Sequence, residues 1–141
     1  MSSETLRWLI AAVLLVHGVG HVLGILAAVG VSTMEKWSSR SWLLTGLLGD
    51  TVSRVICFVF FLLGMIGFIV AALALMSWIF PHEWWRPLSA ISAVISLLGL
   101  GLFWNAFPSF FPNKIGSIVV NVAVLVGLLI AEWPTEAAIG Y

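Results

Sequence analysis

Four long runs of residues without Asp, Glu, Lys or Arg divide the chain into hydrophobic segments separated by short polar connections. They cover residues 8–34, 55–82, 87–113 and 115–131. A helix of ~20 apolar residues crosses the ~30 Å hydrocarbon core of a bilayer. The pattern therefore predicts four membrane-spanning helices, at about residues 8–31, 55–80, 88–107 and 115–131, which form a single domain of residues 1–141.

Short connections make consecutive helices antiparallel neighbours. The predicted fold class is therefore all-α, an integral membrane up-down four-helix bundle. The first connection, residues 32–50, is the longest, and Trp37 and Trp42 flank Arg40 within it. We expect this segment to lie in the membrane interface, where aromatic and basic residues are favoured.

Composition supports a membrane protein and excludes several other classes. Of the 141 residues, 62% are hydrophobic and only 9% are charged, whereas a soluble domain carries about 25% charged residues. The net charge is zero, so nucleic acid is not an expected partner. The single cysteine, Cys57, excludes an internal disulfide. The expected surroundings are the lipid bilayer and other membrane subunits.

The Lys and Arg residues predict an orientation. One side of the predicted bundle carries four of them and the other side two, namely Lys36, Arg40, Arg54 and Lys114 against Arg7 and Arg86. By the positive-inside rule, the connections 32–50 and 108–114 face the cytoplasm. Both termini are then predicted to lie outside.

Two histidines in the first hydrophobic segment are the leading candidates for function. His17 and His21 are four residues apart, so they share one face of a helix. From the ~1.5 Å rise per residue, His17 lies ~15 Å below the outer boundary, at about the depth of Ser96 and Asn121. These three residues are predicted to form a polar layer near the midplane, with His21 ~6 Å deeper.

Two interpretations of the histidines stay open. In one, they join helices by hydrogen bonds. In the other, His17 and His21 bind a cofactor, because ionisable groups at this depth are often functional. Residues i and i+4 cannot hold one haem from opposite faces. A usual metal site needs three or four ligands and no carboxylate lies in a predicted span, so no metal site is predicted and the cofactor is unknown.

Other residues suggest packing more than chemistry. Gly20 and Gly24 form a small-xxx-small pair, which lets helices approach closely, and we favour internal packing over dimerisation for it. His82, beside Glu83, is read as part of a solvated turn. The chain has no nucleophile–base pair, phosphate loop or paired carboxylates, so no catalytic residues are predicted.

The first predicted helix resembles that of DoxX-like membrane proteins, which are small four-helix bacterial proteins. Arg7 precedes the segment, and His17-Gly18 follows ten residues later. The resemblance implies a four-helix bundle in the bacterial inner (plasma) membrane and suggests a link to redox or quinone complexes.

We expect a small, non-enzymatic accessory or structural subunit of a homo-oligomer or a larger membrane complex. The first alternative is a redox-linked or cofactor-binding protein that uses His17 or His21 for haem, pigment, metal or quinone. The second is a small-solute carrier that acts as an oligomer.

Overall fold

The computed structural model describes residues 1–31 and 36–141, and over these ranges it is helical with no strand. Four helical segments are long and apolar enough to cross a membrane: Ser3–Val29, Leu44–Leu75, His82–Leu102 and Phe110–Ile130. The predicted all-α class and the predicted number of spans are confirmed to this extent. Residues 32–35 of the first predicted connection lie outside the described ranges.

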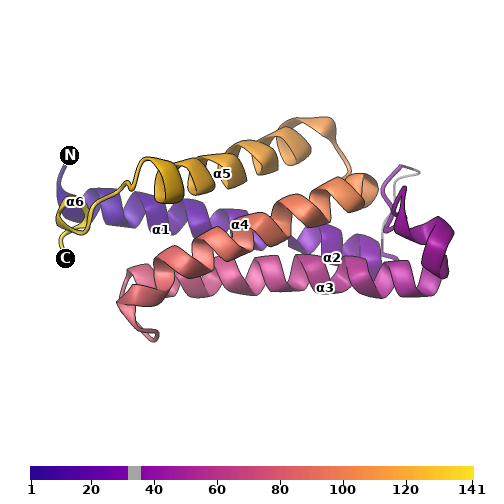
Figure 1. The fold of residues 1–141 in the computed structure, drawn as a ribbon, viewed down its shortest axis with the longest axis horizontal. Helices are drawn as coiled ribbons and strands as arrows, with labels where there is room; N and C mark the ends of the chain where they lie inside the picture. The colour runs from indigo at the N-terminus through magenta and orange to yellow at the C-terminus, as the bar shows by residue number, and fades with distance from the viewer. Residues whose placement is uncertain (32–35) are drawn as a thin grey trace.

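The described residues form six α-helices, of which the first five lie in these segments. They are α1 (Ser3–Gly20), α2 (Val22–Val29), α3 (Leu44–Leu75), α4 (Trp85–Leu102), α5 (Ile115–Leu125) and α6 (Glu136–Ile139). Short 3₁₀ turns lie at His82–Trp84 and Trp104–Ala106, and wider turns at Phe110–Lys114 and Val126–Ile130 extend α5 at both ends. The two termini lie at the same end of the molecule, where α6 packs beside α1 (Figure 1).

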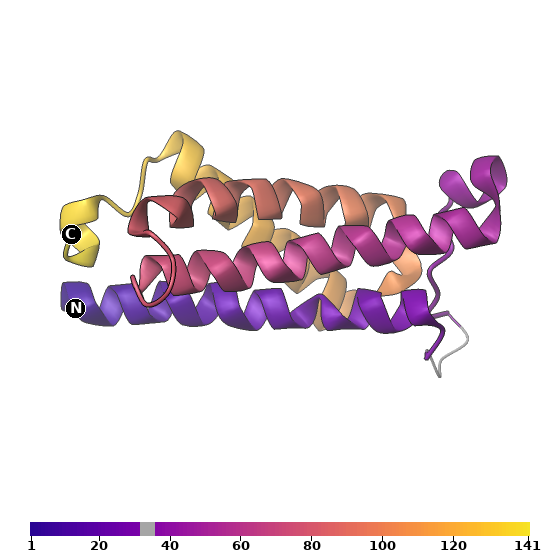
Figure 2. The ribbon, with the colours of Figure 1, turned by 90° about the horizontal axis from the view of Figure 1, so that it is seen from below.

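Helix α3 is the longest and lies against α1, α2 and α4 (Figure 2). It begins at Leu44, earlier than the predicted start at residue 55. The Ser41 hydroxyl accepts hydrogen bonds from the Leu43 and Leu44 amides, which satisfies donors that a helix start leaves free. Gly49 then bends the helix with a φ of 81°, a backbone conformation that glycine adopts without steric cost.

Two tryptophans attach the first connection to the end of α4. The Trp37 indole donates a 2.8 Å hydrogen bond to the Ala106 carbonyl. The Trp42 indole donates one of the same length to the Gly101 carbonyl. Both carbonyls lie where helical hydrogen bonding ends, so the indoles satisfy acceptors that the helix leaves free.

The hydrophobic core has two parts, one on each side of the histidines. Phe68, Leu75 and Trp85 belong to the part near the termini, and Phe61 and Phe103 belong to the other. The His17 ring contacts Phe68, and the His21 ring contacts both Phe61 and Phe68. The polar layer thus lies between two apolar clusters of the helical core.

Candidate functional site

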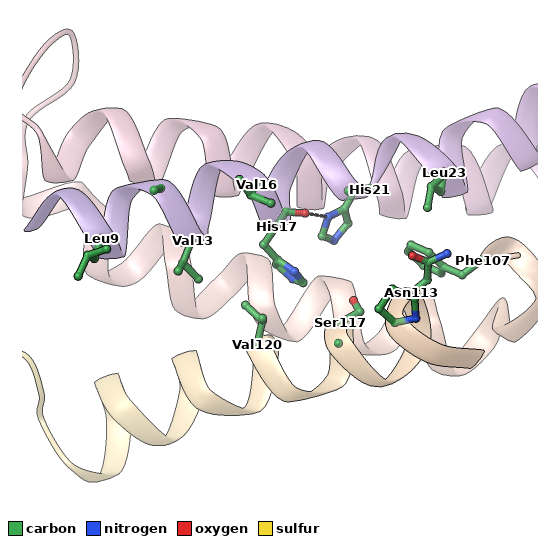
Figure 3. A pocket seen from close by; sticks show the side chains of 14 residues that line it. Leu9, Val13, Val16, His17, His21, Leu23, Phe107, Asn113, Ser117 and Val120 are labelled. Carbon is green, nitrogen blue, oxygen red and sulfur yellow. Dashed lines mark hydrogen bonds between the residues drawn. The ribbon is translucent and has the colours of Figure 1, made fainter. Parts of the chain in front are cut away.

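The candidate site lies at the junction of α1 and α2, where His21 interrupts the helix. The His21 amide donates to the Gly18 carbonyl at 3.1 Å, a tighter turn than an α-helix makes. The His17 carbonyl instead accepts a 2.9 Å hydrogen bond from Nδ1 of the His21 imidazole (Figure 3). A side chain that inserts into the helical hydrogen-bond ladder bends or breaks the helix, which explains the interruption.

Three further hydrogen bonds connect these histidines to α4 and α5. His17 Nε2 lies 3.0 Å from Asn121 Oδ1, Asn121 Nδ2 lies 2.8 Å from Ser96 Oγ, and His21 Nε2 lies 2.8 Å from the same Ser96 oxygen. The structure thus brings together all three residues of the predicted polar layer. It adds His21, whose imidazole turns back toward His17.

The donors and acceptors of this network fit only one arrangement of protons on neutral rings. The His17 carbonyl can only accept, so the single proton of a neutral His21 lies on Nδ1. Nε2 of His21 must then accept the Ser96 hydroxyl proton, and the Ser96 oxygen accepts from the Asn121 amide. Asn121 Oδ1 accepts from His17, so the proton of His17 lies on Nε2.

One ring nitrogen is left over. Nδ1 of His17 makes no hydrogen bond to any residue in the described ranges, and it is not among the fully buried polar atoms without a partner. Both nitrogens of His21 are engaged, and its side chain is 1% exposed. Of the two predicted cofactor-binding residues, only His17 therefore presents a free lone pair.

Glycines let α1, α2 and α3 approach closely around the imidazoles. A Cβ atom built on Gly24 would lie 2.3 Å from the Phe61 ring, and one built on Gly64 would lie 2.8 Å from His21 Cδ2. A Cβ on Gly20 would meet nothing within 4 Å. The predicted pair thus divides: Gly24 lies in the contact between α2 and α3, whereas Gly20 lines the open groove beside His17.

A groove of about 540 Å³ runs beside His17 between α1 and α5 (Figure 3). Its volume is in the range typical of small-molecule sites. Val13, Val16 and Val120 line its apolar wall, and Asn113 and Ser117 add polar groups near the start of α5. No group of three or more His, Cys, Asp and Glu side chains comes together within residues 1–31 and 36–141. Chemically, the groove combines an apolar wall with the free ring nitrogen of His17 and the polar side chains of Asn113 and Ser117.

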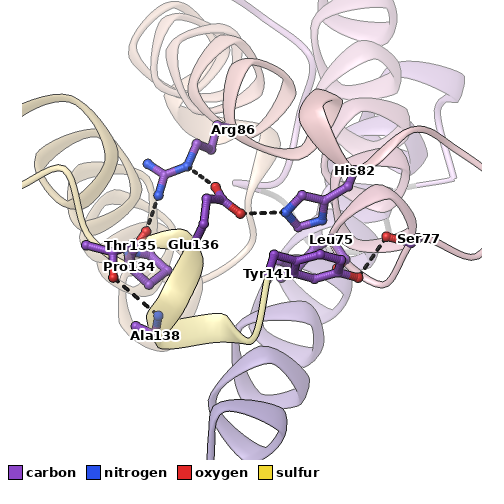
Figure 4. A network of polar contacts seen from close by, with 9 residues as sticks. All are labelled: Leu75, Ser77, His82, Arg86, Pro134, Thr135, Glu136, Ala138 and Tyr141. Atoms are coloured by element: carbon purple, nitrogen blue, oxygen red, sulfur yellow. Dashed lines mark hydrogen bonds and ion pairs between the residues drawn. The ribbon is translucent and has the colours of Figure 1, made fainter.

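A second polar cluster, which the sequence analysis missed, lies at the end of the molecule that holds both termini (Figure 4). Glu136 receives a 3.1 Å hydrogen bond from Arg86 Nε and lies 2.8 Å from His82 Nε2. The Arg86 guanidinium also donates to the Pro134 carbonyl. The Tyr141 ring stacks on His82 at a centroid distance of 3.7 Å.

This cluster fixes the C-terminal segment to the bundle. Burial raises the pKa of Glu136, but the hydrogen bonds from His82 and Arg86 outweigh it and hold the pKa below the usual 4.5. Thr135 caps α6, and Ile139 is fully buried. The predicted solvated turn at His82 is thus a contact with the C-terminal segment. The capping residue Thr135 and the glycine at 140 were the available sequence signals.

Comparisons of the chain with protein-family models, with curated proteins and with solved structures gave no match. The resemblance of the first helix to DoxX-like proteins therefore stays a prediction, and the functional argument depends on the geometry of the site.

Proposed function

We propose that the chain is an integral membrane protein, an up-down bundle of four spans, and that it serves as a non-enzymatic subunit of an oligomer. The observation that carries this proposal is the uneven burial of the four spans. In the most apolar window of Phe110–Ile130, 11% of residues are buried, against 28–39% in the other three segments. The fourth segment is the one that the chain itself covers least.

The uncovered side of this segment is a continuous apolar stripe. Val119, Val122 and Val126 are exposed, and their spacing of three and four residues places them on one helix face. Leu129, in the wider turn that follows α5, is exposed as well. Helix α5 packs on α4, and its buried residues, Ser117 and Asn121, do not belong to this stripe. A stripe with this spacing is the pattern by which two helices interdigitate, so we propose that it meets the same stripe of a second copy.

Disulfide cross-linking in native membranes tests the dimer. In a Cys57→Ala background, we expect Val122→Cys to form a covalent dimer when an oxidant is added. Val59→Cys is the matched control, since Val59 is 43% exposed on α3 and Val122 is 44% exposed. Equal cross-linking of the two variants, or none at Val122→Cys, would reject the dimer. Capture of a different membrane protein by Val122→Cys would replace the second copy with a heteromeric partner.

One observation favours the alternative of cofactor binding. Histidines that ligate metals commonly donate their other ring N–H to an oxygen acceptor, and His17 does so through Nε2 to Asn121. A haem, pigment or metal would then be held by Nδ1 of His17. An absorption spectrum and metal analysis of the purified protein test this. A Soret or pigment band, or stoichiometric metal, that is lost in His17→Gln would assign the cofactor function.

We further propose a location in the bacterial inner membrane with both termini outside. The four-to-two division of Lys and Arg supports the orientation, and the resemblance of the first helix supports the bacterial membrane.

A further inference from the structure

The free nitrogen of His17 has a defined chemical character. The network places the His17 proton on Nε2, so Nδ1 carries a lone pair and no hydrogen. His17 is half-buried and lines the groove between α1 and α5. A polar atom that faces an apolar medium without a partner costs free energy. The groove thus contains an acceptor that a hydrogen-bond donor would satisfy.

The walls around this acceptor fit an apolar molecule. Towards the termini, the groove shares Leu9, Val13 and Val120 with a second crevice of about 370 Å³. That crevice continues between α1 and α5 past Ala123 and Leu128. The two hollows therefore adjoin along α1 and α5, so a hydrocarbon chain bound beside His17 has an apolar surface on which to continue towards Leu128.

From these features we infer that the groove between α1 and α5 binds a lipid-soluble alcohol, whose hydroxyl donates to Nδ1 of His17 while its hydrocarbon part lies along Val13 and Val120. A metal ion fits the groove less well, since a usual metal site needs three or four ligands and His17 offers one. The inference can be judged separately from the proposed dimer, because no residue of the stripe lines the groove beside His17 and only Val119 borders the second crevice.

The test uses a long-chain primary alcohol that carries a photoreactive diazirine, and its methyl ether as a control without a donor. The protein is placed in phosphatidylcholine nanodiscs, because that headgroup has no hydrogen-bond donor. We expect the alcohol to bind about 3- to 10-fold more tightly than the ether, the factor that one net hydrogen bond gives. Labelled peptides should come from α1 and α5.

Two variants of His17 distinguish the effect of its free acceptor at Nδ1 from the effect of its hydrogen bond to Asn121. Glutamine places its amide near the position of Nε2, so His17→Gln keeps a donor to Asn121 and loses the acceptor at Nδ1. Asparagine places its amide near Nδ1, so His17→Asn keeps an acceptor and loses the reach to Asn121. We expect His17→Gln to remove the preference for the alcohol and His17→Asn to retain part of it.

Three results would overturn the inference. They are equal binding of alcohol and ether to the unmodified protein, an undiminished preference in His17→Gln, and labelling that spreads evenly over the exposed faces of α3 and α4. The proposed dimer is judged by cross-linking alone, so either proposal can fail while the other stands.

Discussion

His21 Nε2 and Ser96 Oγ lie 2.8 Å apart at the centre of the bundle, joining α4 to the point where α1 gives way to α2. The same Ser96 oxygen accepts from the Asn121 amide. One hydroxyl group therefore links three helical segments. This arrangement agrees with the interpretation of the histidines as residues that join helices.

Replacement of Ser96 by alanine should destabilise the protein. The change leaves an Asn121 N–H and a His21 nitrogen without partners in a buried site, at a cost of about 1–2 kcal/mol. Unfolding in mixed detergent micelles measures the free energy. Ser89→Ala is the matched control, because Ser89 lies on the same helix and its buried hydroxyl has no hydrogen-bond partner in the part of the chain that the structure describes. A loss of stability in Ser89→Ala as large as that in Ser96→Ala would contradict the assigned role of the network.

Gly24→Ala should be destabilising, whereas Gly20→Ala should not. A methyl group on Gly24 would collide with the fully buried Phe61 ring, and overpacking of this kind costs about 1–3 kcal/mol. The same change at Gly20 meets open space, so it should be neutral or stabilise by up to about 1 kcal/mol. The same unfolding assay compares the two variants. Similar losses at both positions would show that the backbone at this junction, and not the contact with Phe61, sets the cost.

The depth of the polar residues along the helices could be predicted from the sequence. The direction in which each side chain points from its helix could not. Counting residues from the span boundaries at Arg7, Pro87 and Glu132 placed His17, Ser96 and Asn121 at one level, and the structure connects them. The same counting placed His21 deeper and outside the layer. It could not foresee that the His21 ring would turn back to the His17 carbonyl, because that contact depends on a break in the helix.

Contacts between segments that are distant in the sequence could not be predicted either. Nothing in the local sequence of Glu136 indicates that it meets His82 and Arg86, more than 45 residues earlier. The division between Gly20 and Gly24 likewise depends on which face of the helix meets α3. Spacing alone treats the two glycines as equivalent, and only the packing of Phe61 distinguishes them.

Accessibility labelling should place Glu4 outside and Asp50 inside. In a Cys57→Ala background, we expect a membrane-impermeant maleimide to label Glu4→Cys in intact cells. Asp50→Cys should be labelled only after the membrane is made permeable. Both positions are exposed, and neither change alters the counts of Lys and Arg on which the orientation rests. Lys114 is a poor reporter because its side chain is buried beside the Trp104 ring. Labelling of Asp50→Cys in intact cells would reverse the proposed orientation.

Acid should weaken the attachment of the C-terminal segment. The pKa of Glu136 is lower in the folded protein than its usual 4.5, because of the hydrogen bonds from His82 and Arg86. The folded state thus binds this proton less tightly than the unfolded state. The stabilisation is fully present above pH 4.5 and is lost as the pH falls through the lower, folded-state pKa. We therefore expect Glu136→Gln to melt at a lower temperature than the unmodified protein at pH 7, and the difference to disappear in strong acid. The side chain is 46% exposed, so solvent screening should keep the difference small.

Glu132→Gln is a suitable control, since that carboxylate makes no hydrogen bond or ion pair with another described residue. A difference between Glu136→Gln and the unmodified protein that stays constant from pH 7 into strong acid would show that ionisation of Glu136 does not hold this segment in place.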